Sequence, residues 1–271
     1  MSHSARLTKA MIIACLLALL GAGCASTPED EASMSAADLY AEAQRTIRNA
    51  NWELAIKNLR RVQARYPFDP YAIQAHLDML SVHQQMGDAE SVVEEADRFI
   101  KENPRHPKVD YAYYMRGLAW FPKEPFIAND WFDLDQAEAD SSGAERSFQY
   151  FRRLVEAYPS SEYAVDARAR MVWLQNFCAR HELAVAKWYM RREAYVAAAA
   201  RARDLLLEYP ESDSKAPALE LMVLAYRKLG MDDLAEDAMK VLQSNYPGYQ
   251  FQLQFKPRNE RWIDWVADFF S

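Results

Sequence analysis

The stretch AVAKWYMRREAYVAAAARARDLLLEYP, residues 184–210, contains the pattern that decides the fold. Small residues stand at Ala186 and Ala198, and a Tyr-Pro step ends the stretch at Pro210. Small residues at this spacing let two antiparallel helices cross closely, and proline does not continue a helix because it has no backbone N–H. The stretch therefore predicts a helix pair that ends at the Tyr-Pro step.

The same arrangement recurs along the chain. Ala43 and Ala55 stand at the same distances before their own Tyr-Pro step. Units of about 34 residues that end in proline are typical of tetratricopeptide-like helix pairs. The recurring Tyr-Pro or Asn-Pro steps place prolines at Pro67, Pro104, Pro159, Pro210 and Pro247.

The repeats predict an all-α fold, an α-solenoid of five tetratricopeptide-like helix pairs. Each pair must bury its apolar stripe on a neighbour, so we expect the units to stack into a superhelix with a concave face. Such a stack provides a binding surface rather than a reaction centre. We expect the pairs at about residues 36–69, 73–106, 110–161, 162–212 and 216–247, with a tail at 248–271.

One of the predicted helices is unusually long. The step from Pro159 to Pro210 is 51 residues, against 37 from Pro67 to Pro104, and the 14 extra residues make nearly four helical turns. Residues 162–191 contain no glycine or proline. We therefore expect one long helix there, which projects from the solenoid.

Composition excludes several classes of function. The 271 residues carry a net charge of −7 without a long basic block, so the basic face that nucleic-acid binding needs is missing. The seven glycines form neither GxGxxG nor GxxxxGK, the loops that bind phosphate. His181-Glu182 begins an HExxH zinc motif, but Val185 replaces its second histidine. We therefore predict neither catalytic residues nor a metal site.

The N-terminus has the pattern of a targeting segment. Two basic residues precede AMIIACLLALL, residues 10–20, an apolar run too short to span a bilayer. The following LLGAGCAS, residues 19–26, resembles the end of a bacterial lipoprotein signal. In that pattern Gly21 departs from the usual aliphatic residue, and ordinary signal-peptide cleavage nearby is the alternative.

The lipoprotein resemblance implies a lipid anchor. Residues 1–23 would be removed, and Cys24 would carry a diacylglycerol and an N-acyl chain, which are the only attached groups that we expect. Ala25, rather than aspartate, after the cysteine resembles a signal for the outer membrane. Residues 24–35 would then be a flexible tether that holds the repeats in the periplasm.

Four strings within the repeats resemble one family of lipoproteins. They are similar to the BamD (ComL) family, the tetratricopeptide-repeat lipoproteins of the outer-membrane β-barrel assembly machinery, and the resemblance spans roughly residues 35–247. The strings are RYPFDPY (65–71), PRHPKVDYAYYMRGLA (104–119), RLVEAYPSSEYAVDA (153–167) and WYMRREAYVAAAARA (188–202).

The resemblance implies a non-enzymatic periplasmic scaffold. Such a protein assists the assembly and insertion of β-barrel proteins in the outer membrane. It binds the barrel-forming subunit BamA, accessory lipoproteins of the complex and unfolded β-barrel clients. The alternative is a tetratricopeptide lipoprotein that positions a cell-wall synthesis enzyme.

The first helix of each predicted pair supplies a candidate groove. In tetratricopeptide pairs this helix lines the concave face, and aromatic and amide side chains there suit an extended apolar peptide. The alternative is that some of these residues, together with Leu118, form the core between repeats. The candidate groove residues are Tyr40, Gln44, Ile47, Leu77, Gln84, Tyr111, Tyr114 and Phe121.

The alanine-rich segment AAAARAR, residues 197–203, permits close approach of a partner. Arg201 and Arg203 would then stand out as donors for a partner carboxylate. The family resemblance implies that this half of the chain faces BamA, so both arginines are candidate BamA-facing residues. The alternative is a pair of surface arginines with nothing bound.

Two further segments have several interpretations. The acidic insert 122–143 lacks the EF-hand spacing, so we interpret it as a solvated loop or as a partner-docking loop carrying Phe126, Trp131 and Phe132. In the tail, one apolar stripe of a short helix predicts a cap on the fifth pair, a partner contact or a membrane contact. The stripe consists of Trp262, Trp265, Val266, Phe269 and Phe270.

Overall fold

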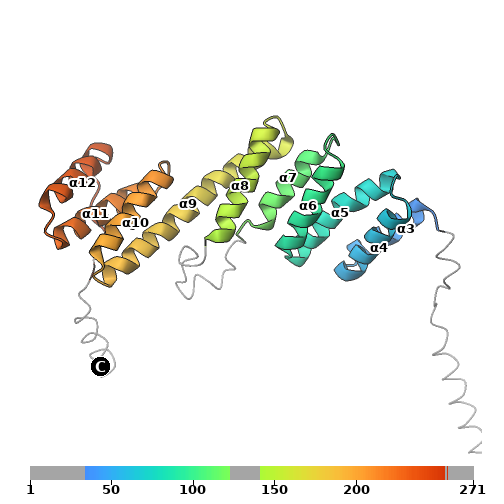
Figure 1. Cartoon of the computed structure of the whole chain (residues 1–271), viewed down its shortest axis with the longest axis horizontal. Coiled ribbons are helices and arrows are strands. Elements are labelled where there is room, and N and C mark those ends of the chain that lie inside the picture. Colours follow the sequence, from blue (N-terminus) through green and yellow to red (C-terminus); the bar gives the residue numbers. More distant parts are fainter. Residues whose placement is uncertain (1–33, 123–140, 254, 256–271) are drawn as a thin grey trace, which may run out of the picture. The chain divides into compact units, whose positions relative to one another are not determined.

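The computed structural model describes residues 34–122, 141–253 and 255, and over these residues it is built from helices without strands. The helices follow one another as five antiparallel pairs (Figure 1), which confirms the predicted fold class. The pairs are α3 (Ala36–Arg48) with α4 (Trp52–Arg65), α5 (Pro70–Met86) with α6 (Ala89–Glu102), α7 (Val109–Ala119) with α8 (Ser142–Ala157), α9 (Glu162–Arg191) with α10 (Tyr195–Glu208), and α11 (Lys215–Lys228) with α12 (Asp232–Asn245).

The second helix of each pair ends at the predicted proline step. The residue before each proline leaves the helical conformation, with φ between −134° and −123°, while its backbone N–H still donates to the carbonyl four residues earlier. A following proline disfavours the helical conformation of the residue before it, so the helix ends there. These last residues are Tyr66, Asn103, Tyr158, Tyr209 and Tyr246.

The small residues of the repeat pattern are at helix crossings. Ala186 of α9 and Ala198 of α10 are fully buried in one cluster. In the third pair, Gly117 of α7 lies so close to α8 that a methyl group there would overlap the ring of Phe151. The hydroxyl of Ser147 also donates to the Gly117 carbonyl at 2.8 Å. The absence of a side chain at Gly117 therefore sets the distance between α7 and α8.

The chain divides into two compact units within α5. The first unit ends at Ala75 and contains α3, α4 and the first turns of α5. The second unit begins at His76 and contains the remaining helices. Within the second unit each helix from α6 to α12 packs against the next one along the chain.

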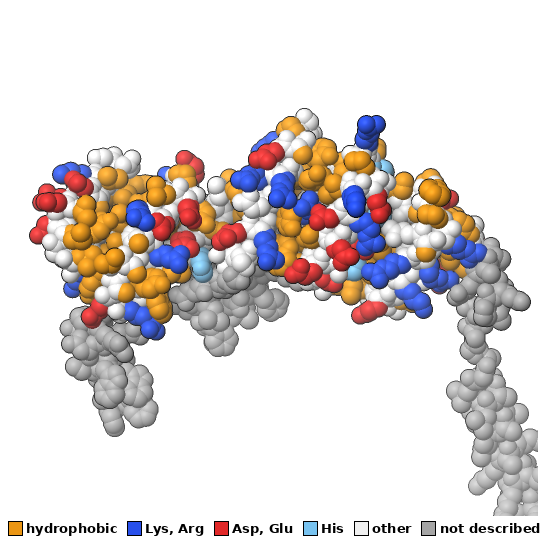
Figure 2. Space-filling view, in the orientation of Figure 1, with side chains coloured by type: hydrophobic (Ala, Val, Ile, Leu, Met, Phe, Trp, Pro, Cys, Tyr) orange, Lys and Arg blue, Asp and Glu red, His pale blue; other side chains and the backbone are white. Residues whose placement is uncertain are grey.

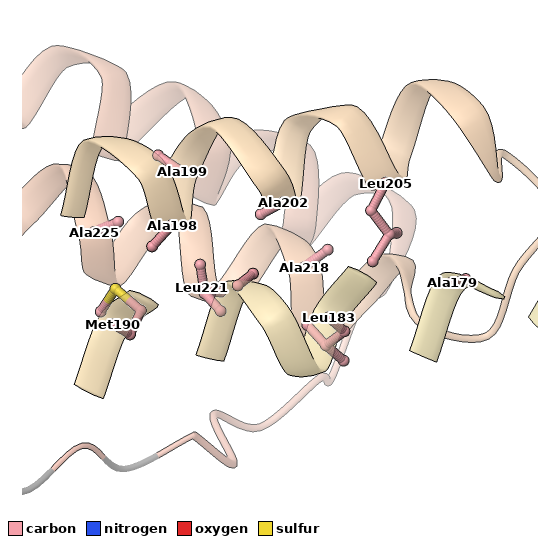
Figure 3. Packing of buried hydrophobic residues seen from close by; sticks show 11 residues of the cluster. Ala179, Leu183, Met190, Ala198, Ala199, Ala202, Leu205, Ala218, Leu221 and Ala225 are labelled. Carbon is pink, nitrogen blue, oxygen red and sulfur yellow. The ribbon is translucent and has the colours of Figure 1, made fainter. Parts of the chain in front are cut away.

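Helix α9 has the length that the sequence predicts, 30 residues, but it does not project. Its first half packs against α8 around Leu174 and Phe177, and its second half packs against α10 and α11 around Leu183 and Met190 (Figure 3). The prediction of a projecting helix was wrong because the apolar positions continue through the extra turns. These turns are therefore buried between the third and fifth pairs.

The described part of the chain carries no helix that is both long and apolar enough to cross a membrane. Several predictions from the sequence lie outside the described residues. They are the signal peptide at 1–23, lipidation of Cys24, the tether apart from its last two residues, the acidic insert apart from its ends, and the apolar stripe of the tail.

Candidate functional site

A cluster of aromatic side chains joins α7 to α9 in the second unit. Tyr114 stacks on Tyr163 with ring centroids 4.9 Å apart, and Tyr111 lies 5.7 Å from the same ring. Just after the end of α7, Phe121 lies 5.1 Å from Trp173 of α9. All five side chains are half-buried, so they pack on one another and also present ring surface to solvent. Aromatic rings presented in this way can hold apolar segments of another polypeptide.

An ionic network lies beside these rings. The Tyr114 hydroxyl donates to Asp166 at 2.6 Å, and Arg170 also lies 2.6 Å from this carboxylate. Burial raises the pKa of Asp166, but the hydrogen bonds from Tyr114 and Arg170 and the arginine charge outweigh it and hold the pKa below its ordinary value. Burial, with the bond to Asp166, raises the pKa of Tyr114 to about 12. At neutral pH the phenol is therefore a neutral donor to a charged carboxylate.

The candidate groove residues of the second unit differ in how accessible they are. Tyr111, Tyr114 and Phe121 are half-buried against α9, so each packs between repeats and still exposes part of its ring, and the groove lining stays a prediction. Gln84 is partly buried, and its amide donates to the Leu118 carbonyl at 3.2 Å. Leu77 is only 3% exposed, so its place in the groove lining is corrected to the core. A leucine buried to this extent has no surface left to offer a peptide.

The candidate groove residues of the first unit form a smaller polar and aromatic group. The Tyr40 ring lies 5.1 Å from that of Tyr71, and the Gln44 amide donates to the Tyr40 hydroxyl at 2.9 Å. Ile47, near the end of α3, is half-buried. The structure therefore brings Tyr40 and Gln44 together, within this unit.

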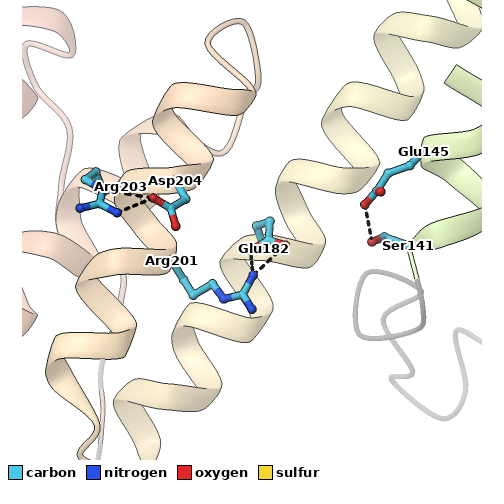
Figure 4. A network of polar contacts seen from close by, with 6 residues as sticks. All are labelled: Ser141, Glu145, Glu182, Arg201, Arg203 and Asp204. Atoms are coloured by element: carbon cyan, nitrogen blue, oxygen red, sulfur yellow. Dashed lines mark hydrogen bonds and ion pairs between the residues drawn. The ribbon is translucent and has the colours of Figure 1, made fainter. Parts of the chain in front are cut away.

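The two candidate BamA-facing arginines are paired inside the chain, as Figure 4 shows. Arg201 of α10 lies 3.1 Å from Glu182 of α9, and Arg203 lies 2.7 Å from its neighbour Asp204. The prediction of lone donors that await a partner carboxylate was therefore wrong. The sequence did not reveal the pair because Glu182 and Arg201 are on different helices. Both arginines are nevertheless about half exposed, at 46% and 59%, so a partner can still reach them.

A cavity of about 630 Å³ lies close to the Arg201 pair, between α8, α9 and α10. Glu145 and Glu182 line it, together with Arg146 and Arg153. The buried Cys178 thiol also lines it, and burial raises the pKa of this thiol to about 11. A thiol that stays protonated at neutral pH is a poor nucleophile. Among the described residues no group of acidic, histidine or cysteine side chains is arranged to hold a metal ion.

Analysis of the sequence missed Glu220, a fully buried carboxylate on α11. It accepts hydrogen bonds from the Tyr249 hydroxyl at 2.8 Å and from the backbone N–H groups of Gln252 and Leu253 at 2.8 and 2.6 Å. These contacts hold the chain after α12 against α11. The available signal was a single charge within the apolar run APALELMVLAY, residues 216–226.

Consecutive antiparallel helix pairs, each ended by a proline step, define a protein of the tetratricopeptide-repeat class. The family model described as outer membrane lipoprotein, YfiO, matches residues 32–242. The outer membrane protein assembly factor BamD of Vibrio cholerae is 35% identical over 223 residues, which cover 82% of this chain and 92% of that protein. BamD of Neisseria meningitidis serogroup A is 35% identical, covering 79% and 80%, and BamD of Xylella fastidiosa strain 9a5c is 33% identical, covering 89% and 82%.

The chain therefore belongs to the BamD family of outer membrane protein assembly factors. The family predicted from the four sequence strings is confirmed. These relatives give no support to the alternative of a scaffold for cell-wall synthesis.

Proposed function

We propose that this chain is a non-enzymatic scaffold that brings unfolded β-barrel clients to the complex that inserts them into the outer membrane. The observation that carries the proposal is the match to BamD relatives over about four fifths of the chain or more. In the described part of that span, the repeats present partly exposed aromatic and amide side chains, among them Tyr114, Tyr163 and Gln44. The proposed partners are a BamA-like barrel-forming subunit, other lipoproteins of the complex and the clients themselves.

The scaffold would be held at the membrane by lipid. We propose that Cys24 carries a diacylglycerol and an N-acyl chain and anchors the repeats on the periplasmic side of the outer membrane. Several acyl chains on one residue suffice for stable anchoring, whereas a single chain gives only marginal binding. No other cofactor belongs to the proposal.

Depletion of the protein tests this function directly. We expect β-barrel proteins to disappear from the outer membrane, measured by quantitative proteomics of that fraction, while incorporation of labelled cell-wall precursor continues at its usual rate. Normal barrel levels together with reduced cell-wall incorporation would refute the proposal and favour the alternative scaffold.

We predict that clients contact Tyr40 and Tyr114, which are on the first helices of their pairs, α3 and α7. A photocrosslinking amino acid at Tyr40 or Tyr114 should capture the carboxy-terminal segments of unfolded barrel proteins, because both rings are half-buried and partly open to solvent. The control places the same amino acid at Leu207 on α10, which is 72% exposed. It shows how much capture results from exposure alone. Equal capture at Leu207 and at the tyrosines would reject the groove.

Arg201→Glu should weaken the pull-down of the BamA-like subunit, by about tenfold if a charge-assisted bond of about 1.5 kcal/mol is lost. The change also breaks the pair with Glu182, so the double variant Glu182→Arg/Arg201→Glu separates the two effects. The double variant restores an internal pair but leaves a carboxylate at position 201. We expect its pull-down to stay weak, and recovery would show that Arg201 acts only within the chain.

A further inference from the structure

The chain after α12 runs back against α11 as a strap, which we define as residues 249–253 and 255. Gly248, with φ of +92°, turns the chain, and the strap has no regular secondary structure. Tyr249 packs beside Leu219 and Leu242, whereas Leu253 and Phe255 pack against the core cluster shared by α9, α10 and α11. The strap therefore occupies a seat that these helices form for a segment of polypeptide without regular secondary structure.

The seat holds the strap mainly by its backbone. Glu220 is fully buried, and the three hydrogen bonds that its carboxylate accepts come from the strap. A carboxylate buried in an apolar surface needs such donors, because an unpaired buried charge is strongly destabilising. Two of the donors are backbone N–H groups, which every residue except proline carries. Because these two N–H groups belong to consecutive residues and reach the same oxygen, Oε1, the main chain turns at this point, and Glu220 can hold such a chain whatever its side chains are.

The strap fills the seat incompletely. A cavity of about 230 Å³ remains beside Leu253 and Phe255, bounded by Met190, Tyr195 and Leu224. Phe251 is also 45% exposed, and Figure 2 shows hydrophobic side chains gathered over the region of α10 and α11. A peptide with larger apolar side chains at the positions of Leu253 and Phe255 would fill space that the strap leaves empty.

The sequence of the strap region has the pattern of a β-strand. In YQFQLQF, residues 249–255, aromatic or aliphatic residues alternate with glutamine. Strict alternation is the period of a strand with one apolar face, whereas the described remainder of the chain is helical. The strap therefore has the side-chain pattern of a β-strand, although its described residues form no strand.

We propose that the seat on α9, α10 and α11 is a docking site for an unfolded polypeptide segment with alternating apolar and polar side chains, and that the strap covers this site until such a segment displaces it. The proposal rests on the proposed function, since unfolded strands of β-barrel clients have this chemistry. It adds a second client site, distinct from the aromatic cluster on α7 and α9, and an internal competitor for it.

The test uses the full chain and a fluorescently labelled peptide YQFQLQF as the probe. Leu253→Gln/Phe255→Gln should release the strap and strengthen probe binding at least tenfold over the original chain, measured by fluorescence anisotropy. Gln252→Pro is the second releasing variant, because it removes one backbone donor to Glu220 and leaves every packing side chain in place. Circular dichroism checks that both variants keep their helical content. Unchanged probe affinity in a folded variant overturns the proposal.

The role of Glu220 is tested in the released chain. Adding Glu220→Gln removes the charge that accepts the backbone N–H groups, so probe affinity should fall about tenfold. Glu236→Gln, at an exposed carboxylate on α12, is the matched control and should change nothing. A probe with glutamine in place of its leucine and last phenylalanine should not bind. Equal affinity for both probes would overturn the proposal that the seat binds apolar side chains of the docked polypeptide.

A strand peptide from a β-barrel protein should compete with the labelled probe for the released chain, and a peptide of the same composition in scrambled order should compete less. Failure of the strand peptide to compete overturns the docking proposal, while capture at Tyr114 tests client binding independently. Light scattering distinguishes a further occupant, the strap of a second copy. If the original chain forms dimers and the probe binds none of the variants, the proposal is overturned. The seat would then bind the strap of a second copy of the chain.

Discussion

Gly117→Ala is expected to lower the free energy of unfolding by about 2 kcal/mol. A Cβ atom at this position would overlap Cδ1 and Cε1 of Phe151 and lie 2.8 Å from Cγ. The Phe151 ring is fully buried, so it has no free space into which it can move. Alanine gains about 1 kcal/mol of helix propensity over glycine, but overpacking a fully buried ring outweighs that gain. The thermal midpoint, followed by circular dichroism, should fall by about 5 °C.

Gly143→Ala is the matched control for this prediction. Its Cβ atom would lie 3.6 Å from the Trp120 ring, an ordinary contact, so stability should stay the same or rise slightly. Adding Phe151→Leu to Gly117→Ala provides the second check, because the smaller side chain relieves the overlap. The double variant should lose less than the sum of the two single losses. Strict additivity would show that Gly117 and Phe151 do not compete for the same space.

Leu205→Ala should cost between about 2 and 5 kcal/mol of unfolding free energy. Leu205 of α10 is fully buried in the cluster with Leu221 and Ala198, so its removal leaves a cavity among three helices. Chemical denaturation followed by tryptophan fluorescence measures the loss. Loss of packing in this cluster should also loosen the seat of the strap, because both share these helices.

Leu207→Ala, two residues further on, is the control on the same helix. Leu207 is 72% exposed, so truncating it should change stability by no more than about 0.5 kcal/mol. Equal effects of the two substitutions would contradict the assignment of Leu205 to the core. The comparison holds helix, residue type and chemical change constant, and only burial differs.

The helices and their ends were predictable because local rules decide them. Proline after Tyr66 or Tyr209 ends a helix wherever the rest of the chain lies, and small residues such as Ala186 mark close crossings. The packing of α9 was not predictable in this way. Whether its extra turns are buried depends on α8 and α11, which the spacing of one helix does not specify.

The candidate site was predictable only in part for the same reason. Tyr111 and Tyr114 were selected by their position in the repeat, and both rings pack on that of Tyr163, which the repeat pattern did not indicate. The partner of Arg201 is 19 positions away, and the partners of Glu220 are between 29 and 33 positions away. Such long-range pairs leave no periodic signal in a single sequence. The burial of Leu77 likewise results from tertiary packing rather than from its own helix.

One continuous helix carries two of the surfaces described above. At 1.5 Å per residue, α9 is a rod of about 45 Å, with Asp166 beside the aromatic cluster and Glu182 beside Arg201. Roughly 24 Å of unbroken helix joins these two carboxylates. Under the proposed function, a client at the rings and a neighbouring subunit at Arg201 would therefore contact two places on one continuous helix, so the spacing between the two partners would be fixed by α9.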